Sequence, residues 1–157
     1  AIFLPLERLF AARTQGVLRL GFWADLCYFL GQYLLFNTPV VFALVWLHGQ
    51  LDHLPLAELR AGFAAWPWAL QFVVAIAISD GAIYWAHRWQ HNSAFLWRFH
   101  RVHHTAEHLD WLAAHREHPL DNLYTRTVEN LPLLLLGFPM ATIAGFAVFR
   151  GLWAVFI

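Results

Sequence analysis

The sequence predicts an all-α integral membrane protein, a helical bundle that carries a histidine-rich helical cap on its cytosolic side. Apolar residues make up 60% of the 157 residues and charged residues 13%, against about 45–50% and about 25% in soluble domains. The apolar residues gather in runs long enough to cross a bilayer. Eight of the ten histidines lie between residues 87 and 118, directly after one of these runs.

The N-terminal residues 1–21 are expected to form a helix that lies on the membrane surface. Leucines and phenylalanines are interspersed there with Arg8, Arg13 and Arg19, a pattern that is typical of an amphipathic helix at a lipid interface. A plain connector fits the same residues equally well. Residues 22–47 follow as the first predicted membrane span, long enough to cross a core of about 30 Å with some tilt.

The first predicted span contains Asn-Thr-Pro at residues 37–39, which is expected to kink it. Cys27 lies inside the same apolar run, so core packing is expected for this single cysteine rather than a disulfide. Residues 48–66 form a short segment that mixes polar and apolar residues, which is typical of a loop between two spans. A second span is predicted over 67–86, opened by Pro67 in the first turn.

A polar block over residues 87–129 forms the predicted histidine cap, and residues 130–157 are apolar again. Gly-Phe-Pro at 137–139 interrupts this last stretch, which therefore predicts either one kinked span or a tight hairpin. The chain lacks an initiator methionine and stops at Ile157 in the middle of the apolar pattern. We expect it to be one membrane domain that is incomplete at its C-terminus.

Arginine placement predicts the orientation in the membrane. Arginines flank the first span on its N-terminal side and the second on its C-terminal side, whereas the loop between the spans contains only Arg60. By the positive-inside rule, the N-terminus and the histidine cap face the cytoplasm. Ten arginines balance ten acidic residues, so net charge gives no case for a nucleic-acid partner.

The histidines have the spacing of metal ligands on helices. His87 and His91 are four residues apart, and His100, His103 and His104 combine spacings of three and four, so each group occupies one helix face. Neutral imidazole is a common nitrogen ligand for transition metals. Five imidazoles exceed what one tetrahedral zinc needs, and the sequence therefore favours two metal ions.

Other interpretations of the histidines were weighed. A zinc protease would carry HExxH, whereas Arg-Trp-Gln separates the first pair here. A membrane haem-b carrier needs only two axial histidines, and a membrane metal transporter would place its ligands near the bilayer midplane. An interfacial pH-sensing cluster would not require this spacing. His108 is a further candidate ligand, whereas His48 and His53 are expected to be solvated loop residues.

Three segments carry a resemblance to a known family: DGAIYWAHRWQH at 80–91, LWRFHRVHHT at 96–105 and HREHPLDN at 115–122. They resemble the fatty acid hydroxylase / sterol desaturase superfamily of membrane di-metal oxygenases. The resemblance covers residues from about 70 to the end. It implies a non-haem centre of two iron ions that uses O₂ and two electrons to hydroxylate or desaturate a lipid C–H position.

The resemblance also implies roles for individual residues. It matches His87 and His91 to a first histidine box and His100, His103 and His104 to a second, and it adds His118 as a further ligand. Asp80 resembles an acidic residue that precedes the first box, although a polar residue that caps a helix or hydrogen-bonds within the bundle fits it equally well. Asp121 could orient an imidazole or be a solvated charge.

The same resemblance has consequences beyond these residues. Family members carry more histidines after the last apolar stretch, which this chain does not reach. An external electron donor, such as a cytochrome b5-like or ferredoxin-like protein, is implied, and zinc could replace iron in purified samples.

Overall fold

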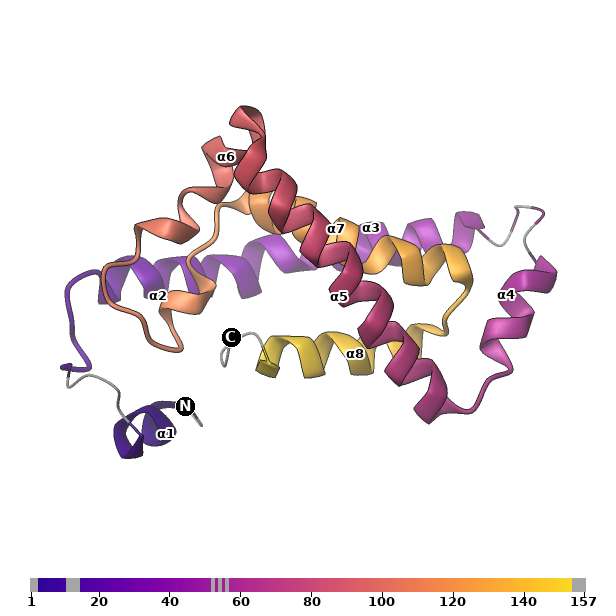
Figure 1. The fold of residues 1–157 in the computed structure, drawn as a ribbon, viewed down its shortest axis with the longest axis horizontal. Coiled ribbons are helices and arrows are strands. Elements are labelled where there is room, and N and C mark those ends of the chain that lie inside the picture. Colours follow the sequence, from indigo (N-terminus) through magenta and orange to yellow (C-terminus); the bar gives the residue numbers. More distant parts are fainter. Residues whose placement is uncertain (1–2, 11–14, 52, 54, 56, 154–157) are drawn as a thin grey trace.

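The computed structural model describes residues 3–10, 15–51, 53, 55 and 57–153 (Figure 1). All regular secondary structure in these residues is helical, which confirms the predicted all-α class. The α-helices are α1 Phe3–Leu9, α2 Phe22–Gly31, α3 Asn37–Leu51, α4 Ala57–Ala64, α5 Trp68–Asn92, α6 Ala94–His100, α7 Pro119–Leu136 and α8 Met140–Trp153. The π-helix η1 covers Gln32–Phe36, and the 3₁₀-helices η2 and η3 cover His103–Thr105 and Ala113–His115.

The N-terminal helix is shorter than expected. α1 ends at Leu9, and residues 15–20 form turns and extended backbone instead of helix. Gly21 follows in the left-handed conformation, with φ of 83°, which a continuing right-handed helix does not allow. Residues 1–2 and 11–14 of the expected helix lie outside the described residues.

The first apolar run forms one continuous helix, Phe22–Leu51, built from α2, η1 and α3. Pro39 has no N–H, and its ring crowds the carbonyl one turn earlier. The π-helical segment η1 ends three residues before this proline, where its wider turn relieves the crowding. The helix continues four residues past the expected end at 47, so His48 is half-buried in α3. The prediction that His48 is a solvated loop residue is therefore wrong, whereas His53 is exposed in a turn as expected.

The second apolar run forms α5, which begins after Pro67. The Pro67 carbonyl accepts hydrogen bonds from the N–H groups of Leu70 and Gln71, so proline occupies the N-cap position. The helix runs to Asn92, six residues beyond the expected end of the span at 86. His87 and His91 thus belong to the same rigid helix as the apolar run.

Within the part of the chain that the structure describes, two helices, Phe22–Leu51 and Trp68–Asn92, are long and apolar enough to cross a membrane. Only 11% and 22% of the residues in their most apolar windows are buried inside the structure. The core helix of a soluble protein would be mostly buried, so this exposure favours a lipid environment. Cys27 is exposed on α2, so the predicted core packing is wrong.

The apolar core lies at one end of the bundle, where α3, α5, α7 and α8 meet. Its buried members are Leu51, Ala75, Leu133, Leu134, Phe138, Ile143 and Phe146. Helix α5 packs most extensively against α7. A buried hydrogen bond of 2.6 Å from Thr142 Oγ1 to Gln71 Oε1 joins α8 to α5.

The break at 137–139 produces two helices. Gly137, with φ of 80°, ends α7, and the Phe138 N–H donates to the Leu133 carbonyl at 3.0 Å, the bond that closes a Schellman motif. The buried Arg60 donates from Nη1 to the Leu134 carbonyl at 2.7 Å, which satisfies another terminal carbonyl. Helix α8 then runs back along the bundle in a hairpin with α7 (Figure 1). Residues 154–157 lie outside the described residues.

Candidate metal centre

A single serine folds the second histidine group back onto the first. Ser93 has extended backbone angles, φ −99° and ψ 119°, which end α5. Its Oγ accepts a hydrogen bond from the Leu96 N–H at 3.3 Å and so caps α6, a standard role for serine. α6 therefore leaves α5 in a new direction, and His100 returns toward His87 and His91.

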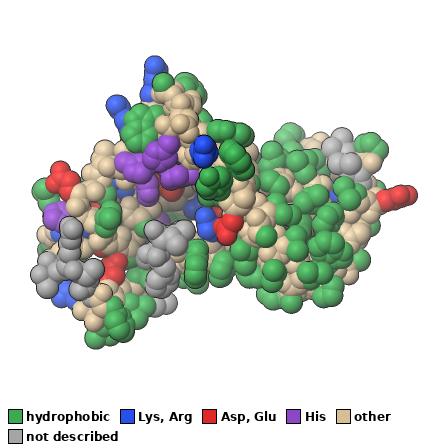
Figure 2. All heavy atoms as spheres, in the orientation of Figure 1, with side chains coloured by type: hydrophobic (Ala, Val, Ile, Leu, Met, Phe, Trp, Pro, Cys, Tyr) green, Lys and Arg blue, Asp and Glu red, His purple; other side chains and the backbone are tan. Residues whose placement is uncertain are grey.

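Four imidazoles converge where α5, α6 and η2 meet: His87, His91, His100 and His104. One nitrogen from each lies within 4.8 Å of the nitrogens of the other three. His87 Nε2 is 3.1 Å from His91 Nε2, and His100 Nε2 is 3.2 Å from His104 Nε2. Figure 2 shows most of the visible histidine surface gathered in one patch, with a smaller separate one near the left edge, away from the largely hydrophobic right end.

These separations match what a shared metal ion requires. Zinc and similar ions bind imidazole nitrogen at about 2.0–2.1 Å, so two nitrogens on one tetrahedral ion lie roughly 3.3 Å apart. Both measured pairs are close to this value. The other nitrogen pairs lie within 4.8 Å of one another, so the four histidines form a group that could hold a metal ion.

Buried hydrogen bonds fix the orientation of His100. Its Nδ1 lies 3.0 Å from Asp121 Oδ2, so Nδ1–H donates to the carboxylate and Nε2 is left for the metal. Gln90 Nε2 donates to the other oxygen, Oδ1, at 2.6 Å, and to Thr125 Oγ1 at 3.2 Å. Asp121 is 5% exposed, so it is a buried orienting group rather than a solvated charge.

The surroundings of the cluster favour neutral imidazoles. The ring centroid of Trp97 lies 5.3 Å from that of His91 and 5.5 Å from that of His104, which covers one side of the cluster. Burial lowers the pKa of His104, and the neighbouring His100 lowers it further. A lowered pKa keeps the ring unprotonated and able to bind a metal.

The other predicted ligands lie around this cluster. The His103 ring is 5.7 Å from that of His100 and 5.3 Å from that of His104, and its Nδ1 is buried without a hydrogen-bond partner among the described residues. His118 is the N-cap of α7: its Nδ1 accepts from the Leu120 N–H at 3.1 Å. Neither joins the four-histidine set, and their ligand roles stay predictions.

Three more residues singled out from the sequence lie elsewhere. His108 is half-buried in the segment after η2. His115 contacts the rings of Phe29 and Tyr33, at 5.0 and 5.6 Å between centroids. Asp80 is paired with Arg150 at 3.0 Å on the surface of the bundle, the bundle interaction that was one of its two predicted roles.

Ion pairs join the cap to the start of the first long helix. Arg19 binds Asp25 at 2.8 Å through Nη1 and Asp110 at 2.8 Å through Nε. Arg116 pairs with the other oxygen of Asp25, whose side chain is completely buried. Two arginines and two aspartates thus balance in charge while they connect α2 and the residues before it to the segments on both sides of η3.

Sequence reasoning missed Gln90 and gave Trp97 no role beyond its place before the second histidine box. Gln90 lies beside His91 in the chain, and its function depends on Asp121, 31 residues later. Trp97 lies three residues before His100, a spacing that His100 and His103 also have. For both residues, the available signal was their position within the histidine-rich segment.

Comparison with known proteins agrees with this geometry. Residues 72–157 match the sequence profile of the fatty acid hydroxylase family. The chain is 39% identical over 75 residues to an ornithine lipid hydroxylase of Rhizobium tropici, a stretch that covers 48% of this chain and 23% of that protein. No solved structure matches the chain.

Two fungal proteins are also similar. The chain is 35% identical over 101 residues to a Δ(7)-sterol 5(6)-desaturase of Gibberella zeae, which covers 61% of this chain and 28% of that enzyme. It is 33% identical over 88 residues to a Δ(7)-sterol 5(6)-desaturase of Aspergillus fumigatus, with 56% and 26% covered. The chain thus spans about a quarter of the length of these relatives.

Proposed function

Because this chain belongs to the fatty acid hydroxylase family, we propose that it is part of a membrane-bound non-haem di-iron oxygenase that hydroxylates or desaturates a lipid C–H position. The convergence of four imidazole nitrogens on one point carries this proposal. The related hydroxylase and desaturases support an oxidoreductase that acts on a lipid.

We assign the first iron to His87, His91, His100 and His104. His103 and His118 are proposed to help hold the second. The buried, unpartnered Nδ1 of His103 supports this assignment, because a buried polar atom without a partner is costly unless something binds it.

Bound iron would supply the activation of O₂ that an unactivated C–H bond requires. In hydroxylation, one oxygen atom enters the C–H bond and the other leaves as water, with two electrons and two protons from a donor. In desaturation, the substrate loses two hydrogen atoms. Together with two electrons and two protons from the donor, they reduce both oxygen atoms to two waters. We propose an external electron donor of the cytochrome b5 or ferredoxin type.

The side chains around the imidazoles fix the orientation of the rings and limit their contact with water. Asp121 keeps the proton of His100 on Nδ1, and Gln90 keeps Asp121 in place. Trp97 restricts water on one side of His91 and His104. Such preorganisation would keep the imidazole nitrogens in position for a bound metal.

Aromatic residues at both ends of α5 support a transmembrane placement. Trp68 at one end and Trp85 and Trp89 near the other are each more than half exposed. At 1.5 Å per residue, Trp68 and Trp89 are about 30 Å apart along the helix, which equals the thickness of a bilayer core. Tryptophans at both interfaces are typical of membrane spans. The histidines would then lie at one interface, where a lipid can present a carbon.

We further propose that this interface is the cytoplasmic one. Arg88, Arg98 and Arg101 are exposed around the histidine cluster, and arginines concentrate on the cytoplasmic side of membrane proteins. The location at the end of α5 also argues against a transporter, whose ligands lie near the midplane. A haem iron would take at most two of these imidazoles, on opposite faces of a porphyrin.

The first test is metal analysis of the protein purified from membranes, with an optical spectrum of the same sample. We expect about two irons per chain and no Soret band, followed by a hydroxylated or desaturated product in a lipid screen. One haem iron, or no transition metal, would overturn the proposal.

A matched pair of variants tests the second ion. His103→Ala should lose metal, whereas His53→Ala should retain all of it, because His53 is exposed in a turn of the opposite loop. Equal metal content in the two variants would contradict the role of His103.

A further inference from the structure

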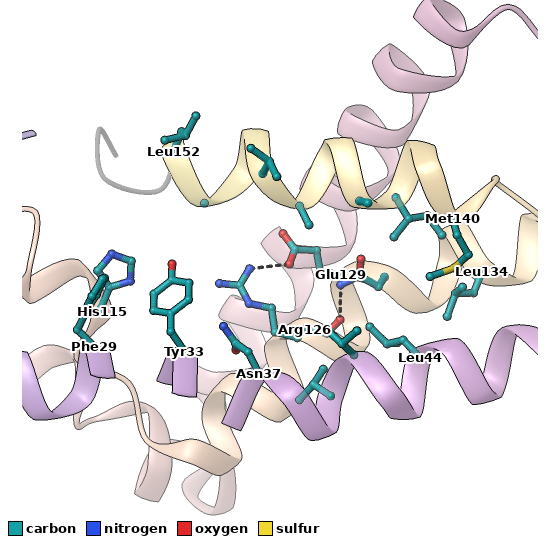
Figure 3. A pocket seen from close by; sticks show the side chains of 18 of the residues that line it. Phe29, Tyr33, Asn37, Leu44, His115, Arg126, Glu129, Leu134, Met140 and Leu152 are labelled. Carbon is teal, nitrogen blue, oxygen red and sulfur yellow. Dashed lines mark hydrogen bonds and ion pairs between the residues drawn. The ribbon is translucent and has the colours of Figure 1, made fainter. Parts of the chain in front are cut away.

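The arginines of α7 and α8 are paired by the protein itself. Arg126 lines a largely apolar cavity of about 630 Å³ bordered by α3, α7 and α8, and its Nη1 donates to Glu129 Oε2 at 2.9 Å (Figure 3). Arg150 pairs with the other oxygen of Glu129 at 3.3 Å and with Asp80 at 3.0 Å. Charge is thus balanced locally in this part of the molecule, and the cavity gives no case for a charged ligand.

Three arginines beside the histidine cluster have no such acidic partners. Arg88 on α5, Arg98 on α6 and Arg101 directly after α6 are exposed. Among the described residues, the side chains of Arg98 and Arg101 make no hydrogen bond or ion pair. Arg88 donates from Nη1 to Tyr84 Oη at 3.3 Å, and its guanidinium carbon lies 5.7 Å from the ring centroid of Trp85. Neither contact neutralises its charge. These three residues are called the arginine patch below.

No acidic residue of the surrounding segment offsets the arginine patch. The sequence over 81–106 contains no aspartate or glutamate. Asp80, just before this segment, is paired with Arg150, and Asp121 is buried against the histidines. Glu107 is exposed, but it follows Arg101 by six residues. Figure 2 shows arginine side chains that project beside and above the histidine patch. This end of the molecule therefore carries a net positive charge.

The level of the arginine patch follows from the way in which α6 folds back along α5 after residues 92–93 (Figure 1). The ring of His91 lies 5.3 Å from that of Trp97, and the ring of His87 lies 4.7 Å from that of His100. The two helices thus run antiparallel here, with His100 level with His87. The arginines that flank these two histidines along the chain therefore lie at about one level, below the outer tip of the helix pair.

Exposed aromatic side chains lie at the same level. Trp85 and Trp89 on α5 and Trp97 on α6 are all exposed. Tryptophans concentrate where the hydrocarbon core of a bilayer meets the headgroups, and the proposed transmembrane placement of α5 puts Trp89 at this boundary. The guanidinium groups beside these rings would then lie at the depth of the lipid phosphates. A soluble protein would meet the outer tip first, so the depth of the patch favours a lipid partner.

We propose that the arginine patch binds the headgroups of anionic phospholipids and so holds the histidine cluster at the membrane surface. A guanidinium forms short, charge-assisted and often bidentate hydrogen bonds with phosphate oxygens. Each arginine close to an anionic membrane surface strengthens binding by about fivefold. The inference rests on the proposed transmembrane placement of α5, but it needs no iron and no oxygen chemistry.

The test compares two lipids with identical acyl chains, phosphatidylglycerol and phosphatidylcholine, because only the first has a net negative charge. Each lipid, with a fluorescent label, is titrated into the protein purified from membranes in an uncharged detergent, and iron content is recorded in parallel. We expect phosphatidylglycerol to bind at least about tenfold more tightly at low salt. This preference should largely disappear in about 1 M salt, where charges are screened beyond about 3 Å.

Variants of the patch locate the effect. The triple variant Arg88→Gln, Arg98→Gln, Arg101→Gln should lose the preference for phosphatidylglycerol and keep its affinity for phosphatidylcholine. Each single substitution should reduce the preference by about fivefold. Arg8→Gln is the matched control, because Arg8 is exposed on α1 beside the acidic Glu7, and this variant should keep the preference.

Three results would overturn the proposal. The first is equal affinity of the parent protein for the two lipids at low salt. The second is an undiminished preference in the triple variant. The third is tighter binding of soluble polyglutamate than of phosphatidylglycerol, which would indicate an acidic protein as the partner. If the parent protein retains iron while it shows no lipid preference, this inference fails and the proposed oxygenase function stands.

Discussion

The two ends of the α5–α7 pair are held together by different interactions, apolar packing at one end and hydrogen bonds at the other. At one end, Ala75 and Leu133 are fully buried among apolar neighbours. At the other end of the same two helices, Gln90 and Asp121 are also buried, but through a hydrogen bond of 2.6 Å. Apolar packing tolerates small shifts, whereas a hydrogen bond to a buried carboxylate requires the two partners in register. The metal end therefore needs a fixed helix register, whereas the apolar end can relax slightly without disturbing it.

The largest effect should come from emptying the apolar end. Phe138 is completely buried, and Phe138→Ala should lower the free energy of unfolding by about 3–5 kcal/mol, through lost contacts and the cavity left behind. Unfolding in detergent micelles measures this change. Leu135→Ala, at a residue 40% exposed on α7, should cost far less. The folded Phe138→Ala protein should bind metal with unchanged affinity. A loss of metal affinity in this variant would mean that the two ends are energetically coupled.

A smaller effect is expected when the metal end loses its orienting carboxylate. Asp121→Asn removes the charged acceptor of the His100 Nδ1–H and should weaken metal binding by about 10–100-fold. Competition with a chelator of known affinity measures this. Asp80→Asn is the matched control, because Asp80 is paired with Arg150 on the bundle surface. If both variants bound metal equally well, Asp121 would be a structural residue only.

The smallest effect concerns pH and comes from His115 in η3, outside both ends of the α5–α7 pair. Burial lowers the pKa of His115, so the unfolded chain takes up a proton near the ordinary pKa of 6.5 before the folded protein does. The stabilisation from this group is therefore complete above that pH and is lost as the pH falls below it. His115→Phe keeps an aromatic ring against Phe29 and should flatten the decrease in unfolding free energy on acidification. An unchanged pH profile in the metal-free variant would contradict this role.

Local sequence patterns were enough to find the two long helices and the histidine sets, although α4 lies within the predicted loop 48–66. Four-residue spacing on one helix face brings His87 and His91 together without help from the rest of the chain, and their nitrogens are 3.1 Å apart. Gly-Phe-Pro at 137–139 marked a break because glycine accepts positive φ, and Gly137 has φ of 80°. Helix ends were less certain: α3 and α5 both extend beyond the expected ends of the spans.

Contacts between segments that are distant in the sequence could not be predicted from such local patterns. Asp121 had two possible roles from the sequence, and only its distance of 3.0 Å to His100 decided between them. The exposure of Cys27 was mispredicted, because an apolar run looks the same whether it faces protein or lipid. Arg126 counted only toward the orientation of the chain, because the cavity that it lines is formed together with α3 and α8, which are remote in sequence.

The sequence alone determined the helical class, the apolar runs and the spacing of the imidazoles, because each depends on residues within a few turns of one another. Tertiary structure decided which four histidines converge, which carboxylate orients one of them, and where an apolar cavity meets an arginine. These features depend on the register of α5 against α7 and on the turn at Ser93. Register results from packing summed over the whole interface, so no single segment of the sequence contains it.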